Sequence, residues 1–158
     1  MAIQARNPRT GLTDYSFEPS DAAEVARVAA RLRAAQPEWL GLGAQARADI
    51  LRRWAKALAE NAEMIVDQLS VDTGRVAIAN VEVFGVIGFL ERWAERGPDL
   101  IDAMSGQGVP SATPGVIIRS RHIPFALVGA IAPWNFPLLL ALIDVIPALA
   151  AGCAAIVK

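Results

Sequence analysis

Apolar side chains dominate the last part of the chain, from Phe125 to Val157, where the single charged side chain is Asp144. Val128–Ala132 is a short apolar run bounded by glycine and proline, which is typical of a buried strand. Leu138–Ile146 is apolar over the length of a helix, and Cys153–Val157 has the pattern of a second buried strand. The pattern predicts strand, helix, strand, which is a βαβ unit with two parallel strands and a right-handed crossover.

Prolines and a glycine divide this apolar segment. Pro137 stands where a helix can begin, because a residue in the first helical turn needs no amide donor. Pro147 lacks that donor and clashes with the preceding turn, so we expect it to kink or restart the helix. Gly152 is expected to stop the helix. Because the two strands show no alternation, we expect them to be covered on both faces.

Upstream of this unit the pattern is mainly helical. Residues 1–19 show no clear periodicity and contain turn signals, which predicts an extended strand or arm. Four helices follow, one apolar on more than one face and therefore expected to lie between neighbours. The first runs from Ser20 or Asp21 to about Ala35 and is ended by Pro37, and the second covers Ala44–Glu60. The third runs from Asn61, its cap, to Gly74. The fourth, Val76–Arg96, is the helix with several apolar faces and is ended by Gly97 and Pro98. Ser105–Pro114 is expected to form a loop, and Val116–Arg121 a half-exposed strand.

Length and composition narrow the classes of protein. The 158 residues are enough for one domain with a sizeable core. The formal net charge of −1 gives no electrostatic argument for nucleic acid or a membrane surface. A single cysteine and the lack of a signal-peptide pattern at the start indicate a reducing, cytoplasmic location. The apolar run is long enough to span a bilayer, but Pro133, Asn135 and Asp144 would each disfavour a lone spanning helix.

The candidate chemistry lies at the ends of the two predicted strands. In open parallel sheets, ligands bind outside the carboxyl ends of the strands. Trp134 and Asn135 follow the first strand and Lys158 follows the second, so a neutral amide and a cation are expected to face one crevice. The residues alone leave open whether Asn135 is a turn or cap residue and whether Lys158 is simply an exposed charge. Cys153 is expected to be a small buried hydrophobic residue.

These residues carry a resemblance to a known family. The cluster Pro133-Trp134-Asn135-Phe136-Pro137, the stretch from Pro147 to Gly152 and Lys158 have the order and spacing found in NAD(P)-dependent aldehyde dehydrogenases. Trp39, Arg47, Leu51 and the segment Asp72–Arg75 fit the same family further upstream. The resemblance covers the chain from about Ser20 to its end.

The resemblance implies a fold and roles for particular side chains. The chain resembles N-terminal helices followed by the start of a Rossmann-like parallel sheet, so residues 1–158 are expected to be an incomplete cofactor-binding domain without the catalytic domain. Asn135 resembles the side-chain amide of an oxyanion hole, which stabilises the alkoxide formed from the aldehyde. Lys158 resembles the lysine that binds ribose hydroxyls of NAD or NADP. Ile131, Pro133 and Trp134 resemble residues on the adenosine side of that site.

The resemblance also implies a reaction and an assembly. Relatives oxidise an aldehyde to a carboxylic acid through a cysteine thiohemiacetal, and their nucleophile and general base lie beyond Lys158, so this chain alone is expected to be inactive. Residues 105–124 resemble an arm that pairs with another subunit in homodimers or homotetramers. No metal, nucleic-acid or membrane partner is implied. Asp144 departs from the family, because many relatives have a basic residue there to which a proton-relay role is assigned. A truncated, non-catalytic module that binds a partner or co-oligomerises is the alternative.

Overall fold

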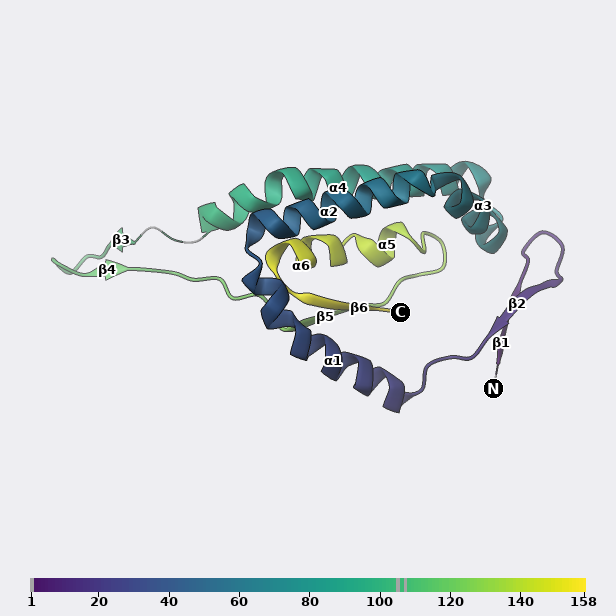
Figure 1. The fold of residues 1–158 in the computed structure, drawn as a ribbon, viewed down its shortest axis with the longest axis horizontal. Helices are drawn as coiled ribbons and strands as arrows, with labels where there is room; N and C mark the ends of the chain where they lie inside the picture. Colours follow the sequence, from purple (N-terminus) through teal and green to yellow (C-terminus); the bar gives the residue numbers. More distant parts are fainter. Residues whose placement is uncertain (1, 105, 107) are drawn as a thin grey trace.

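A computed structural model describes residues 2–104, 106 and 108–158, and within them the chain is a mixed α/β protein. Most of the helices precede the parallel strand pair (Figure 1). The elements in chain order are β1 (Ile3–Arg6), β2 (Thr13–Phe17), α1 (Ala22–Gly41), α2 (Ala44–Glu60), α3 (Ala62–Thr73), α4 (Val76–Met104), β3 (Val109–Pro110), β4 (Ile117–Ile118), β5 (Leu127–Ala130), α5 (Leu139–Leu142), α6 (Val145–Ala151) and β6 (Ala154–Val157).

The predicted βαβ unit is confirmed. Strands β5 and β6 pair in parallel, in a register that joins Leu127 to Ala154 and Ala130 to Val157. The pair lies between α6 on one side and α1 on the other (Figure 1). The strands are nevertheless mostly half-buried, and Gly129 is exposed. Among the described residues only these two strands form this sheet, so both of its edges are open. The prediction that both strands are covered on both faces is therefore only partly met.

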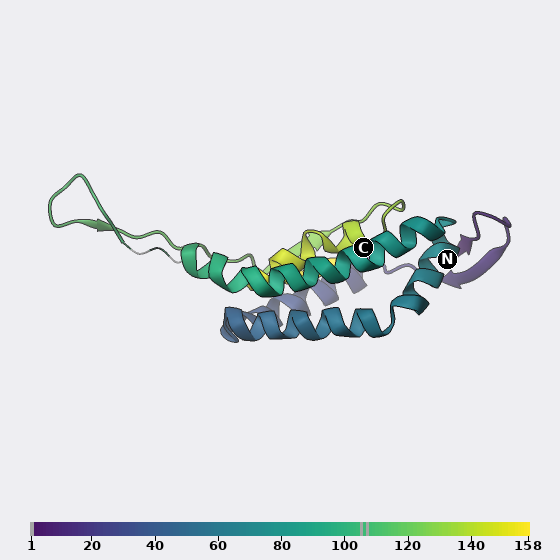
Figure 2. The ribbon, with the colours of Figure 1, turned by 90° about the horizontal axis from the view of Figure 1, so that it is seen from above.

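The hydrophobic core forms where α2 and α4 pack side by side, as Figure 2 shows, with α3 and α6 against them. Its largest fully buried apolar side chains are 0–1% exposed: Leu51, Val83, Val86, Leu90 and Ile146. Helix α4 contributes residues three and four positions apart, the spacing that places side chains on one helical face. The long helix α4 is therefore a rigid element against which the helices after β5 pack.

The end of α6 is bound to α1 and α2, and this fixes the start of β6. Three side chains donate hydrogen bonds to carbonyls at that end: Gln36 to Gly152 (2.8 Å), Trp39 to Leu149 (3.0 Å) and Arg47 to Ala150 (3.1 Å). These bonds satisfy carbonyl groups that a helix terminus leaves unpaired.

Gly152 is required where these elements meet. Its φ of +101° is in the left-handed region, and a Cβ at this position would lie 2.6 Å from Leu40 Cδ1. A glycine stop was predicted at this residue and is confirmed.

Two predicted helix ends are wrong, both at prolines. Pro37 lies inside α1 and Pro98 lies inside α4. A proline in a helix removes one backbone hydrogen bond, but packing can offset the loss. Trp39 and Gln36 tie the helix around Pro37 to the end of α6, and α4 packs against Ala150 of α6 at Gly97. Both helices therefore continue beyond the residue that sequence rules would make their last.

Other boundaries are confirmed in part. Asp21 caps α1 by accepting a hydrogen bond from the Glu24 amide (2.7 Å). Asn61 stands before α3 but its amide donates to Ala57 of α2 (2.8 Å), so its side chain does not act as the predicted cap. The apolar helix before β6 is interrupted near Asp144, and Pro147 falls in the first turn of the restarted helix, where a proline is tolerated.

One surface expectation was wrong. Val81 and Phe84 of α4 are 63% and 59% exposed, so this helix is covered on one face and is not enclosed. An extended strand or arm was predicted within residues 1–19, and there Ile3–Arg6 and Thr13–Phe17 form the antiparallel hairpin β1–β2. The loop expected at Ser105–Pro114 contains β3 at its centre, while Ser105 and Gln107 lie outside the described residues.

In the part of the chain that the structure describes, no helix is both long and apolar enough to cross a bilayer.

Candidate functional site

The carboxyl ends of β5 and β6 lie side by side. The hydrogen-bond ladder continues past the strands, because the Lys158 amide donates to the Ala130 carbonyl and the Ala132 amide donates to the Lys158 carbonyl, each at 2.9 Å. Lys158 is therefore the neighbour of Ile131 across the sheet. Both residues are exposed, Ile131 to 83%. The structure thus brings together two of the residues predicted for a cofactor site.

The segment after β5 turns away from the sheet and leads into α5 (Figure 1). Pro133 and Trp134 are exposed here, Trp134 to 79%, while Asn135 is half-buried. Two large apolar side chains, those of Ile131 and Trp134, are thus exposed in the segment after β5, and Ile131 lies opposite Lys158. Apolar surface with a few polar groups is typical of ligand sites. In parallel sheets such sites lie at the ends of the strands.

The Asn135 side chain has no capping role in the structure. Its amide group makes no hydrogen bond to any residue that the structure describes, and Asn135 is not the residue before α5. The first amides of α5 are satisfied from another helix instead, because Leu138 and Leu139 both donate to Glu82 Oε2 at 2.8 Å. Asn135 lies in a turn between β5 and α5, so the turn interpretation holds, but it does not cap the helix, and its side-chain amide is available to a ligand.

Helix α4 holds the backbone of this segment. Arg75, which precedes α4, donates from Nη1 to the Asn135 carbonyl, and its guanidinium lies 4.9 Å from the centre of the Phe136 ring. Glu82 is only 1% exposed, and its carboxylate faces the two amides named above. Neither residue was predicted from the sequence to have a positioning role. The sequence nevertheless indicated that Glu82 is buried, because it is a lone carboxylate at helical spacing among the buried residues Ala79, Val83 and Val86.

Cys153 has the environment expected of a structural cysteine. It is 5% exposed at the start of β6, and burial raises the pKa of its thiol, an effect that the nearby Arg47 cation opposes. A raised pKa disfavours the thiolate, which is the nucleophilic form. The prediction that Cys153 is a buried hydrophobic residue is confirmed.

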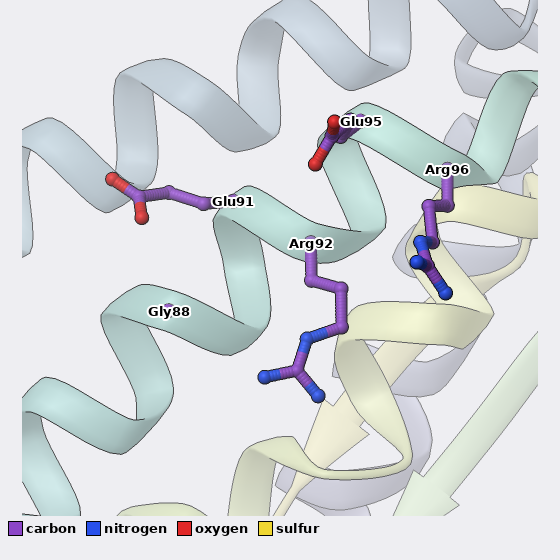
Figure 3. Close-up of a pocket in the computed structure, with 5 residues that line it drawn as sticks. All are labelled: Gly88, Glu91, Arg92, Glu95 and Arg96. Carbon is purple, nitrogen blue, oxygen red and sulfur yellow. The ribbon is translucent and has the colours of Figure 1, made fainter.

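A hollow on α4 is not part of this site. Figure 3 shows the two glutamates and two arginines around it. It is lined by five residues of that one helix: Gly88, Glu91, Arg92, Glu95 and Arg96. Its charges balance and no residue from a strand end contributes to it. In the described part of the chain, no group of three His, Cys, Asp or Glu side chains could hold a metal ion.

The architecture is that of an α/β protein with one pair of parallel strands among the described residues, and comparison with known proteins identifies the family. A sequence model of the aldehyde dehydrogenase family matches residues 1–158. The chain belongs to the aldehyde dehydrogenase family. It is 32% identical to the glutarate-semialdehyde dehydrogenase of Pseudomonas aeruginosa over its whole length, but it covers only 32% of that protein.

Solved structures agree with this assignment. An NAD-dependent benzaldehyde dehydrogenase of Corynebacterium glutamicum superposes with a TM-score of 0.91 and 31% identity, over all of this chain and 34% of that one. An NADP-dependent enzyme of E. coli gives a TM-score of 0.89 and 30% identity, over all of this chain and 32% of that one. The chain therefore spans about a third of the length of these relatives.

Proposed function

We propose that residues 1–158 form the N-terminal part of an oxidoreductase that converts an aldehyde to a carboxylic acid with NAD(P)+. The observation that carries the proposal is the pairing of β5 and β6, which leaves Ile131, Trp134 and Lys158 exposed at one end of a parallel sheet. The family match over the whole chain supports it. The region would be an incomplete cofactor-binding domain, with the catalytic nucleophile and general base supplied by the rest of the gene product.

The exposed residues fit a dinucleotide. Ile131, Pro133 and Trp134 offer an uncovered apolar surface for the flat adenosine group, and the Lys158 ammonium can donate hydrogen bonds to ribose hydroxyls. When bound, NAD(P)+ would accept the hydride that leaves the aldehyde carbon. Relatives include NAD-dependent and NADP-dependent enzymes, and the described residues do not favour one over the other.

Asn135 would act on the aldehyde oxygen. As a cysteine thiolate adds to the carbonyl to give a thiohemiacetal, negative charge develops on that oxygen. A side-chain N–H already aimed at this position stabilises the charge at no reorganisation cost. Asn135 lies in the turn between β5 and α5, and its side-chain amide makes no hydrogen bond to the residues that the structure describes, which supports this role.

Residues 105–124 would form an arm that pairs with another subunit. The hairpin β3–β4 extends away from the body of the protein (Figures 1 and 2) and exposes Val109, Ile117 and Ile118 to 63%, 61% and 55%. An exposed apolar strand edge is a template for pairing with another chain. A homodimer or homotetramer is therefore the expected form of the complete gene product.

An assay of the complete gene product tests the proposed reaction. With glutarate semialdehyde or benzaldehyde and either NAD+ or NADP+, we expect formation of NADH or NADPH, and we expect residues 1–158 alone to give none. Cys153→Ala should not abolish activity of the complete gene product, because this buried thiol is not the nucleophile.

Two results would overturn the proposal. One is NADH formation by residues 1–158 alone that Cys153→Ala abolishes. The other is a folded complete gene product that binds neither NAD+ nor NADP+, which is the behaviour expected of a non-catalytic module that only associates with other chains.

A further inference from the structure

Two oppositely charged residues, Arg75 just before α4 and Glu82 within it, contact the segment that carries Asn135. Arg75 and Glu82 are seven residues apart, which is about two helical turns and places them on the same face. The Arg75 carbonyl accepts a hydrogen bond from the Ala79 amide (2.9 Å), so Arg75 is tied to the first turn of the helix. Glu82 is thus part of the helix that forms the core with α2, and Arg75 is hydrogen-bonded to the first turn of that helix.

Arg75 fixes the segment at Asn135 itself. Its Nη1 donates to the Asn135 carbonyl, and its guanidinium lies 4.9 Å from the centre of the Phe136 ring. A hydrogen bond from a charged donor is stronger than a neutral one, and the stacking on the ring adds a cation–π attraction. These contacts use only the backbone of Asn135, so they orient the residue without occupying its side-chain amide.

Glu82 fixes the segment three residues later. Its Oε2 accepts hydrogen bonds from the Leu138 and Leu139 amides, both at 2.8 Å, and the side chain is 1% exposed. A carboxylate buried to this degree is stable only when it is paired or hydrogen-bonded. The two amides supply that stabilisation, and the backbone at the start of α5 is held in return.

We propose that Arg75 and Glu82 are positioning residues that aim the Asn135 amide at the reacting carbonyl. Arg75 holds the backbone at Asn135 and Glu82 holds it at Leu138 and Leu139, so the turn between them has two fixed ends. The inference rests on the proposed function of Asn135. Loss of either anchor lets the amide shift, and a displacement of about 1 Å can lower a catalytic rate by up to roughly a hundredfold.

Amide hydrogen exchange in the complete gene product tests the anchoring independently of catalysis. In Glu82→Gln, which keeps the size of the side chain but removes its charge, we expect faster exchange at Leu138 and Leu139. In Arg75→Lys we expect faster exchange in the segment from Phe136 to Leu139, because lysine lacks the planar group that both bonds Asn135 and stacks on Phe136. Glu91→Gln, on the exposed face of the same helix, is the control and should leave this exchange unchanged.

Kinetics of the same variants test the consequence for Asn135. We expect Glu82→Gln and Arg75→Lys each to lower kcat by roughly ten- to a hundredfold, with the KM for NAD(P)+ nearly unchanged. Combined with Asn135→Ala, neither should lower kcat further, because the group that they position is then absent.

The outcomes separate the inference from the proposed function. Unchanged exchange in both variants overturns the anchoring, whatever the activity. Faster exchange with unchanged kcat, or an undiminished effect in the Asn135→Ala background, overturns the positioning role. Should Glu82→Gln fail to fold, Arg75→Lys at its half-buried site decides the question alone. If Asn135→Ala has no effect on kcat, the proposed function fails while the exchange result still stands.

Discussion

Replacing Asn135 by alanine should lower the kcat of the complete gene product by about 10²- to 10³-fold, which is the loss found when one oxyanion-hole donor is removed. The amide contributes only when charge develops on the carbonyl oxygen, so the KM for NAD(P)+ should change little. The structure supports this expectation because Asn135 is half-buried in the turn between β5 and α5, and the capping of α5 is performed by Glu82. Steady-state NAD(P)H formation measures the effect.

Asn80→Ala is the matched control for this experiment. Asn80 lies on the exposed surface of α4, where its amide bonds only the Val76 carbonyl one turn earlier (3.2 Å). It should have close to wild-type activity. If Asn135→Ala were equally active with the same thermal stability, the assignment of Asn135 to the oxyanion site would be wrong. If Asn135→Ala lowered the thermal stability but left kcat unchanged, Asn135 would have a structural role in the turn.

The double variant Val109→Asp/Ile117→Asp should convert the assembled gene product into single chains. The two residues lie on β3 and β4 and are 63% and 61% exposed in this chain. Their burial against another subunit would require charged aspartates to lose water, which is costly without a partner charge. Charges on an edge strand also block its pairing with another strand. Sedimentation velocity of wild type and variant at equal concentration measures the change.

Val81→Asp/Phe84→Asp is the control for the arm. These side chains on α4 are exposed to a similar degree, 63% and 59%, but lie on a helix away from the hairpin. The control should keep the wild-type assembly. If it dissociated while the hairpin variant stayed assembled, the interface would lie on α4 and the proposed role of residues 105–124 would be wrong.

The sequence was sufficient for those parts of the fold that depend on local patterns. Helix α2 has the bounds that its periodicity predicted, and Gly74 and Gly152 end their helices in the left-handed conformation. The parallel pairing of β5 and β6 followed from the connection between them. Each of these features is decided by residues close together in the chain.

The errors occurred where distant residues decide the outcome. Pro37 does not end α1, because Gln36 and Trp39 bond carbonyls of α6 more than one hundred residues away. Val81 and Phe84 are apolar yet exposed, since only neighbouring helices determine which face is covered.

The candidate site shows the same division. Asn135 and Lys158 could be proposed from their places after strands, but the support that Glu82 gives to the turn comes from 56 residues earlier in the chain. A buried carboxylate on a helix indicates that some partner must exist, because it cannot be left without a hydrogen bond. It does not indicate which backbone amides will be that partner.

A crystal structure of the complete gene product with bound NAD(P)+ is the most direct measurement of whether the ends of β5 and β6 form the cofactor site. The account predicts Lys158 Nζ in hydrogen-bond contact with a ribose hydroxyl, and Ile131, Pro133 or Trp134 against the adenosine group. It also predicts that the Asn135 amide faces the place where the aldehyde oxygen is bound. A dinucleotide bound elsewhere, in contact with none of these residues, would contradict it.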